Sequence, residues 1–186
     1  MIFLQINLKT QNEINMKKLI LILSIVTVAS ITATAQKHGD SDARKTEFSV
    51  GGVLGIPVGN LSPFASLAYG GDIQVEFPVA PTFGVTASVG YIGFSAKSGY
   101  TISGGLVPLL AGGKYYFSPK FHGDGQLGVS FVTNSGGGGN SSAFTYAVGA
   151  GYMISNNFDL AAKYQSATKN GGDNSFIGLR IAYIIK

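Results

Sequence analysis

Hydrophobic and polar residues alternate along most of the chain after residue 45. The alternation has a period of two residues, which is typical of a β-strand with one apolar face. It recurs in eight segments separated by residues that favour turns, and no part of this region shows helical periodicity. The expected strands cover about residues 46–56, 67–77, 83–94, 105–117, 124–133, 143–154, 158–166 and 175–186.

The connections between the expected strands alternate in length. The long connections hold about eight to ten residues each, rich in glycine, serine and asparagine, and are expected at 57–66, 95–104, 134–142 and 167–174. The short ones are expected at 78–82, 118–123 and 155–157. Long loops at one end and tight turns at the other are typical of an up-and-down antiparallel meander.

Each expected strand divides into two faces of different character. One face carries valine, leucine, isoleucine and aromatic residues, and the other carries mainly glycine, alanine, serine, threonine and glutamine. Every charged residue within the strands falls on the second face. These residues are Glu47, Asp72, Glu76, Lys114, Asp124, Asp159, Lys163 and Arg180.

Two architectures fit a meander with one clean apolar face, a soluble barrel with that face inside and a membrane barrel with that face outside. The interior of an eight-stranded barrel is narrow and is just filled by side chains. It has no room for fourteen aromatic rings together with the other large apolar residues. The pattern therefore predicts an all-β, eight-stranded antiparallel transmembrane β-barrel. Its first and last strands should pair, because an open edge in lipid leaves backbone groups without hydrogen bonds.

The aromatic residues of the apolar face gather near the ends of the strands. Those near the short turns are Phe48, Phe77, Phe83, Tyr115, Phe117, Tyr152, Phe158 and Tyr183. Those near the long loops are Tyr69, Tyr91, Phe131, Phe144, Tyr146 and Tyr164. The β-propensity of aromatic residues explains why they occur in strands but not why they cluster at strand ends on one face. We interpret them as the two aromatic belts of a membrane barrel.

The composition supports the same interpretation. The 186 residues are 45% hydrophobic and only 12% charged, whereas an average soluble domain is nearer a quarter charged. The net charge of +4 includes no basic run of the kind that binds nucleic acid. Because the chain has no cysteine, disulfides, thiolate metal sites and cysteine nucleophiles are excluded.

The segment that begins at Met16, MKKLILILSIVTVASITATAQ, has the parts of a secretory signal peptide. Two lysines precede an apolar run at 19–28, and Ala33 and Ala35 form a small-residue cleavage site before Gln36. A transmembrane anchor is the alternative, but the run is shorter than the roughly 20 residues that a spanning helix needs. The expected organisation is a start-site extension at 1–15, a signal peptide at 16–35, a mobile periplasmic lead-in at 36–45 and the barrel at 46–186.

These features resemble the small eight-stranded outer-membrane barrels of Gram-negative bacteria. The chain is similar to the group called outer membrane protein beta-barrel domain or porin-like proteins, common in Bacteroidota. The resemblance rests on the leader and on the alternating stretches FGVTASVGYIGF and FIGLRIAYIIK. It implies insertion into outer-membrane lipid by the barrel assembly machinery, with both termini in the periplasm. Relatives often end on an aromatic residue that this machinery recognises, and Tyr183 is expected to take that part here.

The inward charges are the main candidates for a site. Unpaired charges in a narrow interior are costly, so we expect a structural plug of salt bridges, with Arg180 near Glu47, Asp159 and Lys163. A gated polar path for ions is the alternative.

An enzymatic function is not expected. His38 lies in the lead-in and His122 in an expected short turn, so neither is placed beside a nucleophilic serine. The glycines at 136–139 lack the helix and lysine of a phosphate-binding loop, and no cluster has metal-ligand spacing, so no cofactor or metal is expected. The sequence favours a structural or surface-interaction protein of unknown ligand. The alternatives are porin-like passage of small solutes and loop-mediated adhesion.

Overall fold

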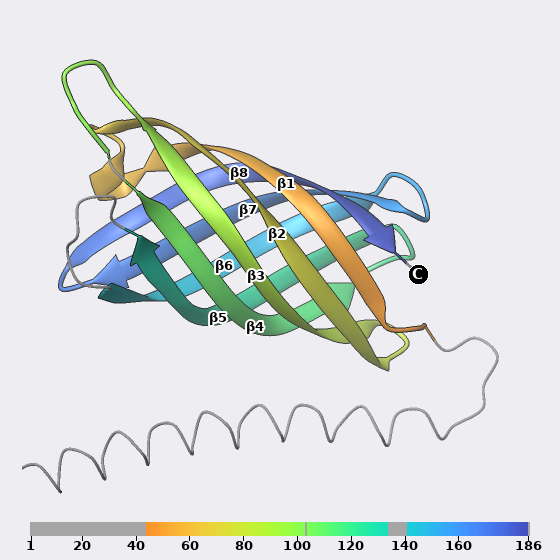
Figure 1. Ribbon diagram of the computed structural model, residues 1–186. Coiled ribbons are helices and arrows are strands. Elements are labelled where there is room, and N and C mark those ends of the chain that lie inside the picture. Colours follow the sequence, from red (N-terminus) through yellow and green to blue (C-terminus); the bar gives the residue numbers. More distant parts are fainter. Residues whose placement is uncertain (1–43, 103, 134–140, 186) are drawn as a thin grey trace, which may run out of the picture. The chain divides into compact units, whose positions relative to one another are not determined.

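The computed structural model describes residues 44–102, 104–133 and 141–185, and these form one closed barrel (Figure 1). Eight strands follow one another around the barrel in chain order, each antiparallel to its neighbours. The strands are β1 (Glu47–Val58), β2 (Ala65–Ala80), β3 (Phe83–Ala96), β4 (Gly105–Tyr116), β5 (Phe121–Thr133), β6 (Ser141–Met153), β7 (Phe158–Lys169) and β8 (Gly172–Ile185). The predicted strands, their order and their all-antiparallel meander are confirmed.

The barrel closes through β1 and β8, as predicted. The two strands pair in antiparallel register from Phe48 opposite Ile185 to Val58 opposite Ser175. This seam leaves neither strand with a free edge, so each backbone ladder is complete around the circumference.

The barrel has two unlike ends. At the turn end, where β1 begins and β8 finishes, short turns join β2 to β3, β4 to β5 and β6 to β7. At the loop end lie the connections β1–β2, β3–β4, β5–β6 and β7–β8. The β1–β2 connection contains a single 3-10 turn, η1 (Gly59–Leu61).

One predicted loop is wrong. The segment 167–174 was expected to be a long loop, but β7 and β8 extend through it to a two-residue turn at Asn170 and Gly171. Both residues have positive φ, 49° and 81°, as a type I′ hairpin requires. Asn-Gly is the dipeptide that favours this turn most strongly. The sequence therefore contained the turn dipeptide, but the residues on either side of it are too polar to be recognised as strands.

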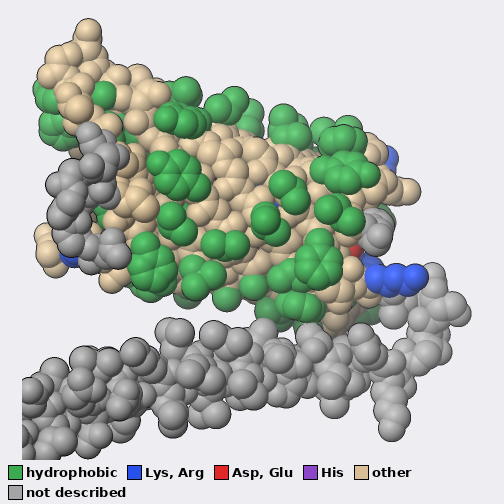
Figure 2. All heavy atoms as spheres, in the orientation of Figure 1, with side chains coloured by type: hydrophobic (Ala, Val, Ile, Leu, Met, Phe, Trp, Pro, Cys, Tyr) green, Lys and Arg blue, Asp and Glu red, His purple; other side chains and the backbone are tan. Residues whose placement is uncertain are grey.

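The apolar face of the strands lies on the outside of the barrel. Leu54 is 62% exposed and Leu127 is 60% exposed, whereas Gln126 on the opposite face of the same strand is 1% exposed. Figure 2 shows hydrophobic side chains spread over the visible wall, with lysine and arginine toward the barrel ends. Such a surface is the reverse of a soluble protein's and matches the lipid-facing band of a membrane barrel. Among the residues that the structure describes, no helix is long and apolar enough to span a membrane.

Candidate functional site: the barrel interior

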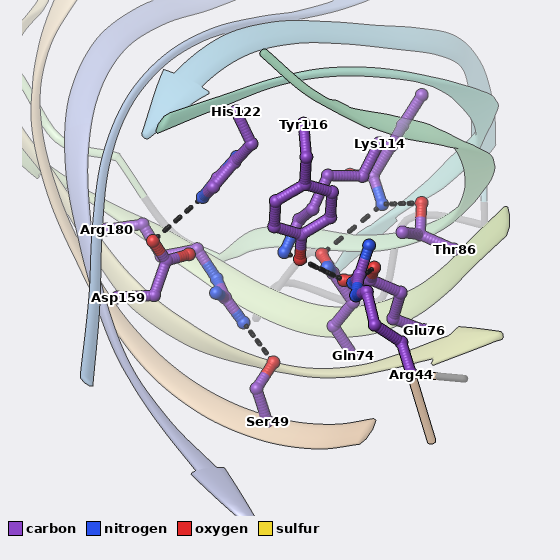
Figure 3. Close-up of polar contacts among 11 residues, drawn as sticks. Arg44, Ser49, Gln74, Glu76, Thr86, Lys114, Tyr116, His122, Asp159 and Arg180 are labelled. Carbon is purple, nitrogen blue, oxygen red and sulfur yellow. Dashed lines mark hydrogen bonds and ion pairs between the residues drawn. The ribbon is translucent and has the colours of Figure 1, made fainter. Parts of the chain in front are cut away.

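The structure places the charged residues of the strands on the inner face of the barrel. Glu76, Lys114, Asp159, Lys163 and Arg180 are buried, and Glu47, Asp72 and Asp124 are partly buried. They gather in the half of the interior nearer the turn end, and Figure 3 shows several of them converging there. The interior is therefore the candidate site, and the contacts among these side chains determine what it can do.

Arg180 on β8 reaches across β1 to a carboxylate on β2. Its Nη2 lies 2.6 Å from Asp72 Oδ1, its Nε donates to the same carboxylate at 2.8 Å, and Nη2 also donates to Ser49 Oγ at 3.1 Å. The sequence placed Arg180 near Glu47, Asp159 and Lys163, on the neighbouring strands, but the residue that it pairs with is one strand further away. The pair thus ties three strands together at the seam.

Gly51 makes this reach possible. It lies on β1 between the two partners, opposite Asp72 in the β1–β2 register and opposite Ala182 in the β1–β8 register. A Cβ atom at Gly51 would lie 2.8 Å from Arg180 Nε. A glycine here therefore leaves the space that the guanidinium occupies.

A second cluster surrounds Glu76 at the mouth of the turn end. Lys114 Nζ lies 3.0 Å from Glu76 Oε2, and the Tyr116 hydroxyl donates to the same oxygen at 3.0 Å. Arg44 forms an ion pair with Glu76 Oε1, and its guanidinium stacks 3.7 Å from the centre of the Tyr116 ring. Two strands, β2 and β4, and the segment before β1 therefore meet at one carboxylate (Figure 3).

Two residues of this cluster were not predicted from the sequence to be part of the interior. Arg44 belongs to the segment expected to be a mobile lead-in, but the structure describes it held in the mouth of the barrel. Tyr116 was not considered, although its even position on β4 is shared with inward-facing Lys114. Residues 36–43 of the lead-in, together with the predicted signal peptide and its cleavage site at Ala33, Ala35 and Gln36, lie outside the described residues.

His122 was placed wrongly by the sequence analysis. It lies not in a turn but within β5, which begins at Phe121, and it is 1% exposed. Its Nε2 lies 2.8 Å from Asp159 Oδ1 on β7. Gly151 on the intervening strand leaves room for the ring, since a Cβ there would overlap the imidazole. The histidine is therefore part of the interior and contacts the charged residues.

Gln126 occupies the middle of the barrel and joins residues from opposite walls. Its amide oxygen accepts a hydrogen bond from Lys163 Nζ at 2.7 Å. Its amide nitrogen donates to Thr86 Oγ1 at 3.1 Å and lies 3.4 Å from Gln74 Oε1. These contacts link β7, β5, β3 and β2, so the side chain spans the lumen.

The loop-end half of the interior has a different filling. A buried apolar cluster there includes Val53, Ile92, Phe94, Leu106 and Phe176. The rings of Phe94 and Phe176 meet edge to face, with centroids 6.4 Å apart. This cluster was not predicted from the sequence, because the inward-facing positions are mainly small or polar.

The predicted belt residues lie on the outer wall. Twelve of the fourteen rings are exposed, and Phe77 and Tyr164 are partly exposed. Neighbouring rings contact one another, as in the pair Phe158–Tyr183, whose centroids are 5.2 Å apart. Phe121 is a further exposed ring near the turn end that the sequence analysis placed in a turn.

The interior thus contains ion pairs, a spanning glutamine and an apolar layer stacked along its length. Among the described residues, no group of three histidine, cysteine, aspartate or glutamate side chains could hold a metal ion. The arrangement holds strands together and fills the lumen.

Comparisons with known proteins agree with this fold. Residues 21–184 match the family described as outer membrane protein beta-barrel domain. No curated protein sequence matches the chain.

Three solved structures illustrate the likeness. The outer membrane protein Ail of Yersinia pestis, in a phospholipid bilayer nanodisc, is 15% identical with a TM-score of 0.54, covering 76% of this chain and 99% of that one. Neisserial surface protein A is 13% identical with a TM-score of 0.51, covering 76% and 96%. The de novo designed protein TMB2.3 is 17% identical with a TM-score of 0.50, covering 79% and 99%. At such low identity, the likeness shows a shared fold.

Proposed function

The chain belongs to the outer membrane protein beta-barrel domain family, and from this premise we propose that it is a closed barrel with a structural or surface-interaction role. It is an integral protein of the outer membrane, and its wall contacts lipid. In this proposal the strands carry no solute, and the loop end presents the surface that meets other molecules.

The observation that carries the proposal is the position of Gln126. Its contacts to Lys163 on one side and Thr86 on the other cross the lumen at 2.7 Å and 3.1 Å. Beyond this point the apolar cluster around Phe94 and Phe176 fills most of the interior, and the Thr145 hydroxyl beside it is already bonded to Ser130. An ion would therefore have to displace hydrogen-bonded groups first and then cross a largely apolar layer.

Planar-bilayer recording tests the proposal against passage of ions. The refolded wild-type barrel is expected to show no steady conductance. The double variant Gln126→Ala with Phe176→Ala, which opens both halves, is expected to show intermittent current. Steady, voltage-independent conductance from the wild type would instead identify the protein as a pore.

We also propose how the protein reaches and crosses the membrane. A signal peptide at 16–35 is cleaved before Gln36, the barrel assembly machinery inserts the chain, and the termini remain in the periplasm. The loop end then faces outward. Because both are two-residue turns, the connections at 170–171 and 81–82 give a matched pair of sites for an epitope tag.

An antibody applied to intact cells is expected to bind the tag at 170–171 and not the tag at 81–82. The reverse result would mean that the barrel is inserted the other way round. Mass spectrometry of the protein from the outer membrane is expected to find Gln36 as its first residue.

A further inference from the structure

The loop end contains a pocket of about 310 Å³. Its walls come from the β1–β2 and β3–β4 connections and from the adjoining ends of the strands. Most of its lining is apolar or aromatic and includes Leu61, Phe64, Phe94, Tyr100, Ile102 and Leu106. We propose that this pocket is a binding site for a small, uncharged aromatic molecule with one hydrogen-bonding group.

The floor of the pocket is closed. Phe94 and Leu106 line it and also belong to the buried apolar cluster, where Leu106 is 1% exposed. Behind them Phe176 packs edge to face against Phe94. A molecule that enters from the loop end therefore meets packed side chains and stays, so the site binds rather than transports.

The walls of the pocket are held in place before any ligand arrives. The Lys97 backbone N–H donates to the Phe64 carbonyl at 2.8 Å, and Lys97 Nζ donates to the Ser62 carbonyl at 2.7 Å. These bonds join the β3–β4 connection to the β1–β2 connection. The rings of Phe64 and Tyr100 then meet at right angles, 5.1 Å apart, to make one wall. A preformed site binds more tightly because less order has to be imposed on binding.

The lining defines the chemistry of the ligand. None of the described residues lining the pocket is charged, so a charged ligand would lose its hydration without compensation. The Thr133 hydroxyl is already bonded to both backbone groups of Gly105. Asn174 also lines the pocket, and its amide makes no hydrogen bond to another described residue, so it can serve one polar group of the ligand.

The volume defines the size of the ligand. A pocket of about 310 Å³ is at the small end of the roughly 300–1,000 Å³ range of small-molecule sites, so it admits a compact molecule. A fused two-ring compound with one N–H group fits this description, and the aromatic walls favour a flat ring over an alkyl chain through edge-to-face contacts. Indole is a suitable probe.

Methyl NMR of the protein in phospholipid nanodiscs tests the proposal. Indole is expected to shift the methyl signals of Leu61 and Leu106 with a saturable dependence on concentration. Ile102→Trp should fill the pocket and weaken binding at least tenfold. The matched control is Ile73→Trp, the same change on the exposed outer wall, and it should leave binding unaltered.

A second variant guards against failure of the first to fold. Phe64→Ala removes one wall from an exposed connection and is expected to weaken binding severalfold. The proposal is overturned if the shifts grow linearly with indole to the same extent in every protein, which is partition into lipid. It is equally overturned if binding is saturable but neither pocket variant changes it.

Discussion

The two halves of the barrel interior close the same lumen by different means. Near the turn end, buried ions and amides fill the space and are held by specific hydrogen bonds, such as those from Arg180 to Asp72. Near the loop end, apolar side chains such as Phe94 and Phe176 form most of the filling and pack by shape, with a few buried polar side chains such as Thr145 among them. Both kinds of residue lie at inward-facing, alternate positions of the strands, so the two-residue period does not distinguish them.

The difference has energetic consequences. A buried ion pair loses hydration, and its attraction roughly offsets that loss only while both partners are present. Removal of one partner is therefore more harmful than removal of both. An apolar layer follows the opposite rule, since its loss scales with the volume removed and does not depend on a partner. The following variants separate these two kinds of core.

The largest effect is expected from Arg180→Leu, which leaves the largely buried Asp72 carboxylate without its cation. The free energy of unfolding should fall by about 3–5 kcal/mol, measured by urea denaturation in lipid vesicles and followed by heat-modifiable migration in gels. The double variant with Asp72→Asn should recover much of the loss. Unchanged stability in the single variant would remove the case for a salt-bridge plug.

A smaller loss, about 3 kcal/mol, is expected from Phe176→Ala in the apolar half, because a buried ring leaves a cavity. The neighbouring change Ile177→Ala, on the lipid-facing side, is the control and should cost much less since lipid fills the space. The same unfolding assay applies. Equal losses at the two positions would mean that the loop-end layer is not a packed core.

Gly51→Ala tests the space beneath the guanidinium in the charged half. The new methyl should displace Arg180 from Asp72 and cost about 1–3 kcal/mol. Gly52→Ala is the matched control, since a Cβ there meets no atom within 4 Å. If both alanine variants unfold at the same urea concentration, Arg180 has room to move and the glycine is not required.

The smallest effect is expected from Arg44→Ala at the mouth. The Arg44 side chain is 24% exposed, and Glu76 keeps Lys114 and Tyr116 as partners, so the loss should be below about 1 kcal/mol. Added salt should reduce this loss but leave that of Arg180→Leu nearly unaltered, because buried pairs are screened less. A loss equal to that of Arg180→Leu would show that the mouth is as dry as the interior.

The features set by periodicity were predictable from the sequence. The number of strands, the outward apolar face and the seam between β1 and β8 all follow from a two-residue period and from the need to satisfy backbone groups in lipid. Each depends on many residues, so single errors of boundary do not disturb them.

The partners inside the barrel were not predictable in the same way. Which inward residues meet depends on strand register and tilt, and a side chain as long as that of Arg180 can pass over a neighbouring strand where Gly51 leaves space. His122 was lost through a boundary error of three residues at the start of β5. Phe94 and Phe176 lie on the same face of their strands as the inward polar residues. The two-residue period shows which face a residue is on but not how far along the barrel axis it lies.

The seam between β1 and β8 joins the first and last strands, so no other pairing closes so long a loop. Loop closure of this length carries the greatest entropic cost, and we expect this pairing to be the last to form. Arg180 meets Asp72, 108 residues away, and Ser49, 131 residues away, only when that pairing has one register. A slip of one residue turns Arg180 toward the hydrocarbon. The ion pair thus favours the correct register in the final step of assembly, because a barrel closed in the wrong register would expose Arg180 to lipid.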